Sequence, residues 1–278
     1  DLPQFTDKLR YWLDGHPEWR ANVRGIAGGW VGDLRPRCIT RDLDWGVPIP
    51  LDDPDAAGKR IYVWFDAPIG YVTNTRQWGL DRHGDPDAWI PWWKDAETRL
   101  VHFIGKDNVP FHAVIFPSML MGQGDYILPD QVVANEYLNV FNRRTGQSEK
   151  GSKSRGNMIS VDWALEHFSA DSLRYYLCAV APESKDADFD WDDFMNRYNG
   201  ELCDVVGNFV HRSLTMTVKN FDGKVPEAGE LEADDIAMLD AVGEHADLVA
   251  ESLEGFRFRQ GIERMVDLGR KANVYFDA

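Results

Sequence analysis

Short apolar runs that alternate with segments of helical spacing constrain the fold more than any other feature of this chain. Residues 100–105 and 131–134 are two such runs, of the kind found in buried strands. Residues 109–121 between them carry apolar side chains at helical spacing, and Gly122 and Gly124 are expected to end that helix. Strands that alternate with helices predict a parallel α/β sheet.

Further segments extend this alternation on both sides. Residues 61–65 form a short apolar run that predicts another buried strand, with a helix after it, and residues 137–141 are expected to form a fourth strand. Two short helices are predicted over residues 160–168 and 170–177, the first with Ser160 as its N-cap.

The last third of the chain changes to long helical spacing, and the boundary falls near residue 185. A helix starting at about residue 191 carries an apolar stripe made by Phe194, Tyr198, Leu202, Val205, Phe209 and Leu214. Residues 232–254 and 257–276 fit two more helices. The sequence therefore predicts an all-α bundle that follows an α/β domain.

Length and composition place the chain in a broad class. It has 278 residues, more than one compact domain usually takes, and 44% of them are hydrophobic. No apolar run is long enough to span a membrane, and the start has no signal-peptide pattern. The cysteines Cys38, Cys178 and Cys203 are far apart, which fits a reducing cytoplasm, and no pair has metal-ligand spacing. We expect a cytoplasmic protein without a membrane partner.

The net charge of −16 argues against a nucleic-acid partner for the chain as a whole, because phosphates need cations. Local basic clusters could still meet such a partner, and they comprise Arg143, Arg144 and residues 150–155, then Arg257, Arg259, Arg264, Arg270 and Lys271. The dispersed acid excess suggests, as a hypothesis, adaptation to high salt. An acidic protein of ordinary salt is the alternative.

Residues 149–157 hold three cations and two glycines among polar residues, a composition suited to a loop that closes over a triphosphate. Glycine lets the backbone come close, and lysine carries a mobile point charge. An isolated run of this kind could equally be a solvated basic turn. With residues 62–71 and 103–112 before it, however, the run resembles the KMSKS loop of the methionyl-tRNA synthetases, a family of class I enzymes. The resemblance covers nearly the whole chain, and Gly151 replaces the usual Met of the loop.

The resemblance implies a fold and an activity. The fold is α/β: the second half of a Rossmann-type class I catalytic domain, followed by an all-α helical bundle. Residues 1–60 would be the end of a connective insertion, 61–148 the half-domain, 149–185 the KMSKS loop and stem-contact region, and 186–278 a truncated anticodon-binding domain. The implied reaction is ATP-dependent formation of methionyl-adenylate and transfer to tRNA(Met), with Mg²⁺ accompanying ATP.

Site residues follow from the same motifs. The methionine pocket would comprise Arg41, Trp64, Ala67, Pro68, Tyr71, Asn108 and His112. The ATP site would comprise Gly105, Asp107, Ser152, Lys153 and Ser154. Lys150 and Lys153 are expected to stabilise the charge that builds on the phosphates in the transition state. Asn208 and Arg212, four apart on one helix face, are expected to read the anticodon.

Plainer alternatives exist for these residues. Trp64 and Tyr71 could be core aromatics, and His112 a satisfied core histidine. Arg41 could pair with Asp42 or Asp44 at the surface, and Asn208 with Arg212 could be an exposed polar helix edge. Asn108 and Phe116 stand where the family often has an aliphatic residue and Trp, so the shape of the pocket stays open.

Two features of the family are missing from the sequence. It has no HIGH signature and no C-x-x-C zinc knuckle, both of which belong to an N-terminal half that this chain lacks. We therefore expect a fragment cut at both ends, without independent aminoacylation, and with an exposed apolar edge where the missing half-sheet should sit. The missing half would be a partner beside methionine, ATP and tRNA(Met). A non-catalytic tRNA- or methionine-binding module is the alternative function.

Overall fold

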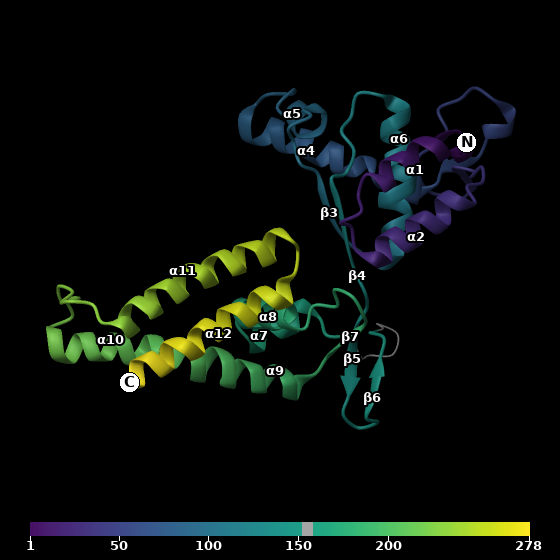
Figure 1. Cartoon of the computed structure of the whole chain (residues 1–278). Coiled ribbons are helices and arrows are strands. Elements are labelled where there is room, and N and C mark those ends of the chain that lie inside the picture. Colours follow the sequence, from purple (N-terminus) through teal and green to yellow (C-terminus); the bar gives the residue numbers. More distant parts are fainter. Residues whose placement is uncertain (152–157) are drawn as a thin grey trace. The chain divides into compact units, whose positions relative to one another are not determined.

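The computed structural model describes residues 1–151 and 158–278 of the chain (Figure 1). Its contacts divide the chain into two compact units, Asp1–Asn135 and Glu136–Ala278. The four functional regions expected from the sequence are a different division and stay a prediction.

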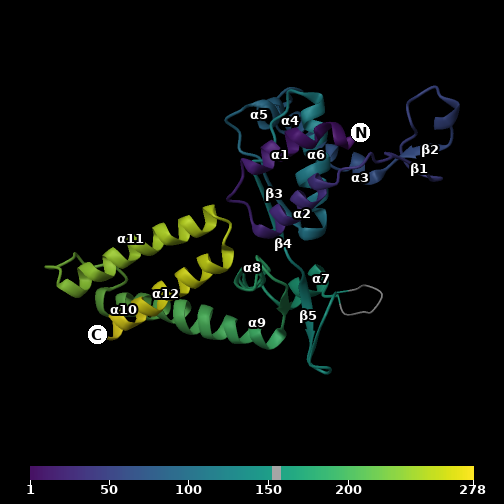
Figure 2. The same ribbon diagram turned by 45° about the vertical axis from the view of Figure 1, so that its right-hand side comes forward.

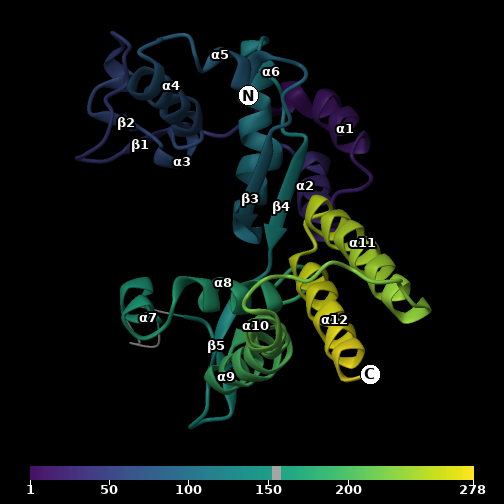
Figure 3. The same cartoon turned by 90° about the vertical axis from the view of Figure 1, so that its left-hand side faces the viewer.

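The first unit is built around a parallel pair of strands, β3 (Val101–Gly105) and β4 (Gln131–Asn135), which lie side by side in Figure 3. Val101 is paired with Gln131 and Gly105 with Asn135, so both strands end at the same edge. The connection runs through a 3-10 turn (Lys106–Asn108), a π-helical turn (Phe111–Ile115) and α6 (Phe116–Gln123). Gly124 ends α6 at a φ of 100°, a backbone conformation that favours glycine. The strand–helix–strand prediction is confirmed.

Two helices cover the strand pair with apolar faces. They are α1 (Thr6–Asp14), preceded by a 3-10 turn (Leu2–Phe5), and α2 (Ala21–Gly32). The shared core is formed by Leu9, Val23, Ala27, Val109, Val114, Val132 and Ala134. Phe103 of β3 is 56% exposed, so at least one large apolar side chain faces outward from this pair.

The predicted strand over residues 61–65 is wrong. The strand is β2 (Lys59–Ile61), antiparallel to β1 (Thr40–Asp42), and Val63–Asp66 forms a short helix, α3. The amide of Ala67 donates to the carbonyl of Val63, which closes the helical turn. Val63 and Trp64 are about half exposed, at 51% and 46%. A short apolar run cannot by itself distinguish a strand from a helical turn.

The rest of the first unit is helical. A 3-10 turn (Pro54–Ala56) lies between β1 and β2, and α4 (Ile69–His83) and α5 (Ile90–Lys94) follow α3. A second core forms where Trp93 packs against Phe116 and Leu120 of α6. This contact fixes α4 and α5 within the unit, since the indole of Trp93 donates to the hydroxyl of Thr75 in α4 at 2.9 Å.

The second unit begins with a small mixed sheet in the order β6–β5–β7. The hairpin of β5 (Leu138–Asn142) and β6 (Gln147–Glu149) is antiparallel, and β7 (Ala187–Phe189) is parallel to β5. The fourth predicted strand therefore forms, but in another sheet from that of β3 and β4. Between β6 and β7 the described residues form α7 (Val161–His167), whose N-cap Ser160 accepts the amide of Trp163 as expected, and α8 (Ala170–Ala179).

The predicted helical bundle is confirmed in the remainder of this unit, as Figure 2 shows. It comprises α9 (Trp191–Arg197), a π-helical stretch (Tyr198–Gly207), α10 (Asn208–Phe221), α11 (Ala233–Glu254) and α12 (Phe258–Asp277). Tyr176, Phe189 and Phe194 join the sheet to the bundle in one buried aromatic cluster. Among the residues described, no helix has the length and apolar character needed to cross a membrane.

Candidate functional site

A hydrogen bond between Tyr71 and His112 is the centre of the candidate site in the first unit. Tyr71 lies in the first turn of α4, and His112 lies in the π-helical turn after β3. The Nδ1 atom of His112 is 3.0 Å from the carbonyl of Asn108, which can only accept, so Nδ1 carries the hydrogen. The Nε2 atom is then an acceptor, and the Tyr71 hydroxyl, 2.9 Å away, donates to it.

Burial keeps this histidine neutral. It lowers the pKa of His112 below the ordinary 6.5 and outweighs the bond to the Asn108 carbonyl, which raises it. The ring of a second histidine, His102 of β3, lies 5.1 Å from that of His112 and 5.5 Å from that of Tyr71. Burial first, and then His112, lower the pKa of His102 to about 4. The site therefore presents two uncharged imidazoles at neutral pH.

An aromatic wall extends from this pair. The ring centroids of Trp64 and Phe111 are 5.2 Å apart. Trp64 reaches this position because Ala67 and Pro68 join α3 to α4 in a tight turn, in which the amide of Tyr71 donates to the carbonyl of Pro68. Trp64 therefore contacts Phe111, the residue before His112, whereas Tyr71 contacts His112 itself.

A cavity of about 440 Å³ adjoins this wall. It is lined by Trp64 and Phe111 together with Arg41, Tyr62 and Cys38. The guanidinium of Arg41 lies 4.0 Å from the centroid of the Tyr62 ring and donates to the carbonyls of Cys38 and Thr40, both at 2.8 Å. The surface pair of Arg41 with Asp42 or Asp44 does not form, since Asp42 binds Lys59 and Arg41 binds main chain. Ala67, Pro68, Tyr71, Asn108 and His112 do not line this cavity.

The predicted nucleotide-binding residues follow the end of β3. Gly105 is its last residue, and Asp107 lies in the 3-10 turn that follows it. This edge, outside the carboxyl ends of parallel strands, is where α/β sheets bind ligands. Asp107 therefore lies at the edge of the strand pair where α/β sheets bind ligands.

The predicted catalytic loop lies in the second unit. The ammonium of Lys150 is 4.2 Å from the centroid of the Tyr137 ring, a cation–π contact. Lys150 also lines an apolar cavity of about 560 Å³ bounded by β5, α7 and α8. Ser152, Lys153 and Ser154 lie outside the described residues.

The two residues expected to read RNA lie on the first turns of α10. Asn208 is exposed, and Arg212 is half-buried. The guanidinium of Arg212 pairs with Asp277 and lies 4.3 Å from the centroid of the Phe276 ring, both on α12. The alternative of a free polar edge therefore does not describe Arg212, which is held in place by α12.

His102, Phe111 and Tyr62 were not among the site residues predicted from the sequence. For His102 a signal existed, because alternate residues of a strand share one face and His102 is two residues from Ile104, which packs on the core. The sequence contained no separate indication for Tyr62 or Phe111, since the position of each side chain depends on the turn that its segment adopts.

A parallel strand pair with a ligand edge and neighbouring aromatic and cationic side chains is typical of nucleotide-binding α/β enzymes. Comparison with known proteins gives the family. The model of the family described as "tRNA synthetases class I (M)" matches residues 1–214. The chain therefore belongs to this family of class I tRNA synthetases.

Individual relatives agree with this result. The methionine–tRNA ligase of Salinibacter ruber is 47% identical over 99% of this chain, and that of Bacteroides fragilis is 48% identical over 96%. The crystal structure of Mycobacterium tuberculosis methionyl-tRNA synthetase bound by methionyl-adenylate superposes with a TM-score of 0.84 at 29% identity, covering all of this chain and 52% of that one. The chain spans only about two fifths of the length of these curated relatives, 39% and 38%.

Proposed function

We propose that this chain is the part of a methionine–tRNA ligase that binds methionine, contacts ATP through the KMSKS loop and reads the anticodon of tRNA(Met). The observation that carries the proposal is the Tyr71–His112 hydrogen bond beside the Trp64–Phe111 wall. The similarity to methionine–tRNA ligases over nearly the whole chain supports it.

The chemistry of this wall suits a thioether. Sulfur makes favourable contacts with the edges of aromatic rings, and Trp64 and Phe111 supply such edges. Because His112 is neutral and its Nε2 lone pair is engaged by Tyr71, this histidine offers no charge to a competing lysine or glutamate side chain. Burial of either charge would be unfavourable, so the site favours methionine. Arg41 lines the same cavity as Trp64 and Phe111, where it would pair with the carboxylate of the substrate.

ATP would bind at the edge that follows β3, with Asp107 accepting from the ribose and Gly105 allowing close approach. The methionine carboxylate then attacks the α-phosphorus, and pyrophosphate leaves. Lys150 and Lys153 stabilise the negative charge that builds on the phosphates. Ser152 and Ser154 contact the same nucleotide.

Mg²⁺ would arrive with ATP. Among the described residues no group of three or more His, Cys, Asp or Glu side chains could hold a metal ion. Mg²⁺ usually keeps several waters and binds one or two carboxylates together with substrate phosphates. Its chemistry would be to neutralise phosphate charge.

The anticodon would be read by the side chains that α10 presents. Asn208 and Arg212 can hydrogen-bond to base edges in a single-stranded loop, which is how RNA sequence is usually recognised. The contact of Arg212 with Asp277 and Phe276 supports the proposal, since it orients the guanidinium before RNA binds.

A cytoplasmic location fits the three free thiols of the chain.

Methionine-dependent exchange between ATP and pyrophosphate tests the proposal. The chain is assayed alone and with the HIGH-containing N-terminal half of a relative supplied as a separate polypeptide. We expect exchange only in the mixture, and we expect His112→Leu to raise KM for methionine while the exposed control His83→Leu leaves it unchanged.

A second candidate is a methionine- or tRNA-binding module without catalysis. No exchange in the mixture, together with intact tRNA binding, would decide for this module and against the ligase.

A further inference from the structure

A small cavity in the second unit is lined by three arginines. It has a volume of about 210 Å³, and its charged lining residues are Arg197, Glu201, Arg259, Glu263 and Arg270. Arg259, Glu263 and Arg270 belong to one face of α12, because residues 4 and 11 positions apart lie on the same side of a helix. The basic cluster noted in the sequence is thus split by the fold, and only two of its arginines enter the cavity.

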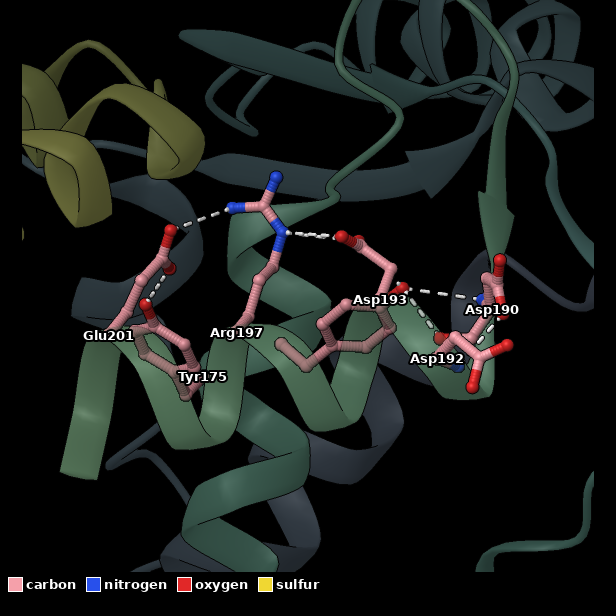
Figure 4. Close-up of polar contacts among 7 residues, drawn as sticks. Tyr175, Asp190, Asp192, Asp193, Arg197 and Glu201 are labelled. Carbon is pink, nitrogen blue, oxygen red and sulfur yellow. Dashed lines mark hydrogen bonds and ion pairs between the residues drawn. The ribbon is translucent and has the colours of Figure 1, made fainter. Parts of the chain in front are cut away.

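Arg197 is already neutralised by neighbours on its own helix (Figure 4). Its Nε donates to Asp193 at 3.1 Å, and its Nη1 donates to Glu201 at 3.4 Å. The second oxygen of Glu201 accepts from the hydroxyl of Tyr175. Burial first, and then Glu201, raise the pKa of Tyr175 above its ordinary value, so it stays a donor. Both oxygens of Glu201 are therefore engaged by neighbouring side chains.

Arg259 and Arg270 differ from Arg197. Neither guanidinium makes an ion pair or a side-chain hydrogen bond with any residue that the structure describes. The main-chain amide of Arg259 donates to Glu183 at 3.2 Å, which anchors this end of α12. Two cations that converge on one cavity repel each other, and an anion between them removes the repulsion. The guanidinium fork matches the oxygens of phosphate in particular.

Glu263 restricts the ligand further. It lies on the same helix face as the two arginines and forms no ion pair with either of them in the described part of the chain, so it opposes a bare anion. A ligand that carries a hydrogen-bond donor next to its phosphate can pair its phosphate with the arginines and its donor with the Glu263 carboxylate. The ribose 2′-hydroxyl of RNA is such a donor, and it is the group that distinguishes RNA from DNA.

We propose that this cavity binds one phosphate of an RNA backbone through Arg259 and Arg270, and the adjacent ribose 2′-hydroxyl through Glu263. The inference rests on the proposed function, since tRNA is the RNA that such an enzyme would meet. Contacts to phosphate and sugar carry no sequence information of their own. The contact is therefore independent of base sequence and adds to recognition by Asn208 and Arg212.

The test is tRNA binding by the 278-residue chain as a function of KCl concentration. Each lost phosphate contact lowers the slope of log K against log [salt] by about 0.7 to 1. We expect Arg259→Ala and Arg270→Ala each to reduce affinity several-fold and the slope by about this amount. Arg264→Ala is the matched control, because it removes the same charge from the same helix outside the cavity, and its slope should fall less. Circular dichroism checks folding, and Arg270→Gln replaces any variant that fails to fold.

The comparison of an RNA hairpin with a DNA hairpin of the same sequence tests the role of Glu263. We expect the parent chain to prefer RNA and Glu263→Gln to lose part of that preference. Affinities and slopes of Arg259→Ala and Arg270→Ala that equal those of Arg264→Ala would overturn the inference and leave the ligase proposal intact. A parent chain that binds no tRNA would also overturn it, whereas the exchange assay judges the ligase proposal separately.

Discussion

The buried imidazole of His102 should make the stability of the first unit depend on pH. The side chain is only 7% exposed, and its Nε2 has no hydrogen-bond partner among the described residues. The perturbation that tests this is acidification from about pH 7.5 to about pH 5, which spans most of the ordinary titration range of histidine.

The magnitude follows from the pKa. Burial lowers the pKa of His102 from 6.5 to about 4, so the unfolded chain binds a proton that the folded unit rejects. Stability is therefore unaffected above about pH 7 and falls as the pH drops below 6.5, until the folded pKa is reached. One pKa unit is worth about 1.4 kcal/mol, which gives ~3 kcal/mol in full and ~2 kcal/mol at pH 5. His112, whose pKa is lowered in the same direction, adds to the loss.

The stability of the first unit is measured by urea unfolding with a brief deuterium pulse. Mass spectrometry of peptides from β3 and β4 reports the deuterium uptake of this unit alone. Carboxylates with a lowered pKa, such as Asp235 and Asp267, also make the stability of the fold decrease in acid, but they belong to the second unit. We expect His102→Leu to lose about 2 kcal/mol less than the parent between the two pH values. The exposed control His83→Leu should behave as the parent does.

The refuting result is a pH dependence that His102→Leu leaves unchanged to within about 0.5 kcal/mol, the usual error of additivity between sites. It would mean that water reaches the imidazole and that the neutral state of the site is not imposed by burial. His102→Gln, which keeps polarity without titrating, replaces the leucine variant if that variant does not fold at neutral pH.

Three further predictions concern single contacts and the surface. Tyr71→Phe leaves the Nε2 of His112 without its donor, so urea unfolding of the first unit should show a loss of about 1–3 kcal/mol; an unchanged midpoint would mean that water replaces the hydroxyl. Ser160→Ala removes the N-cap of α7 and should cost about 1 kcal/mol in the second unit, whereas Ser160→Asp should retain most of it. If the net charge of −16 is an adaptation to high salt, the rate of ATP–pyrophosphate exchange by the chain mixed with the N-terminal half should rise with KCl concentration. An optimum at low salt would support an acidic protein that works at ordinary salt concentrations.

Local patterns predicted most helices and strands because their causes are local. Ser160 caps α7 and Gly124 ends α6 through contacts within four residues. The apolar stripe beginning at Phe194 holds only in part, because Phe194 is buried whereas Leu214, at its other end, is 62% exposed. The run over residues 61–65 failed because pairing decides between strand and turn. Only Lys59–Ile61 finds a partner in Thr40–Asp42, and the residues after it close a turn instead.

The chemistry of the site depends on contacts that no spacing contains. Tyr71 and His112 are 41 residues apart, and the resemblance to the synthetases named both without indicating that one donates to the other. The proton on Nδ1 follows from the Asn108 carbonyl, and the lowered pKa follows from burial behind β3 and α6. The same holds for Arg259 and Arg270, which the sequence showed only as members of a basic cluster. Their convergence on one cavity depends on the packing of α12 against α8 and the π-helical stretch after α9. The cavity that would separate a phosphate-binding arginine from a solvated one therefore forms only in the folded chain.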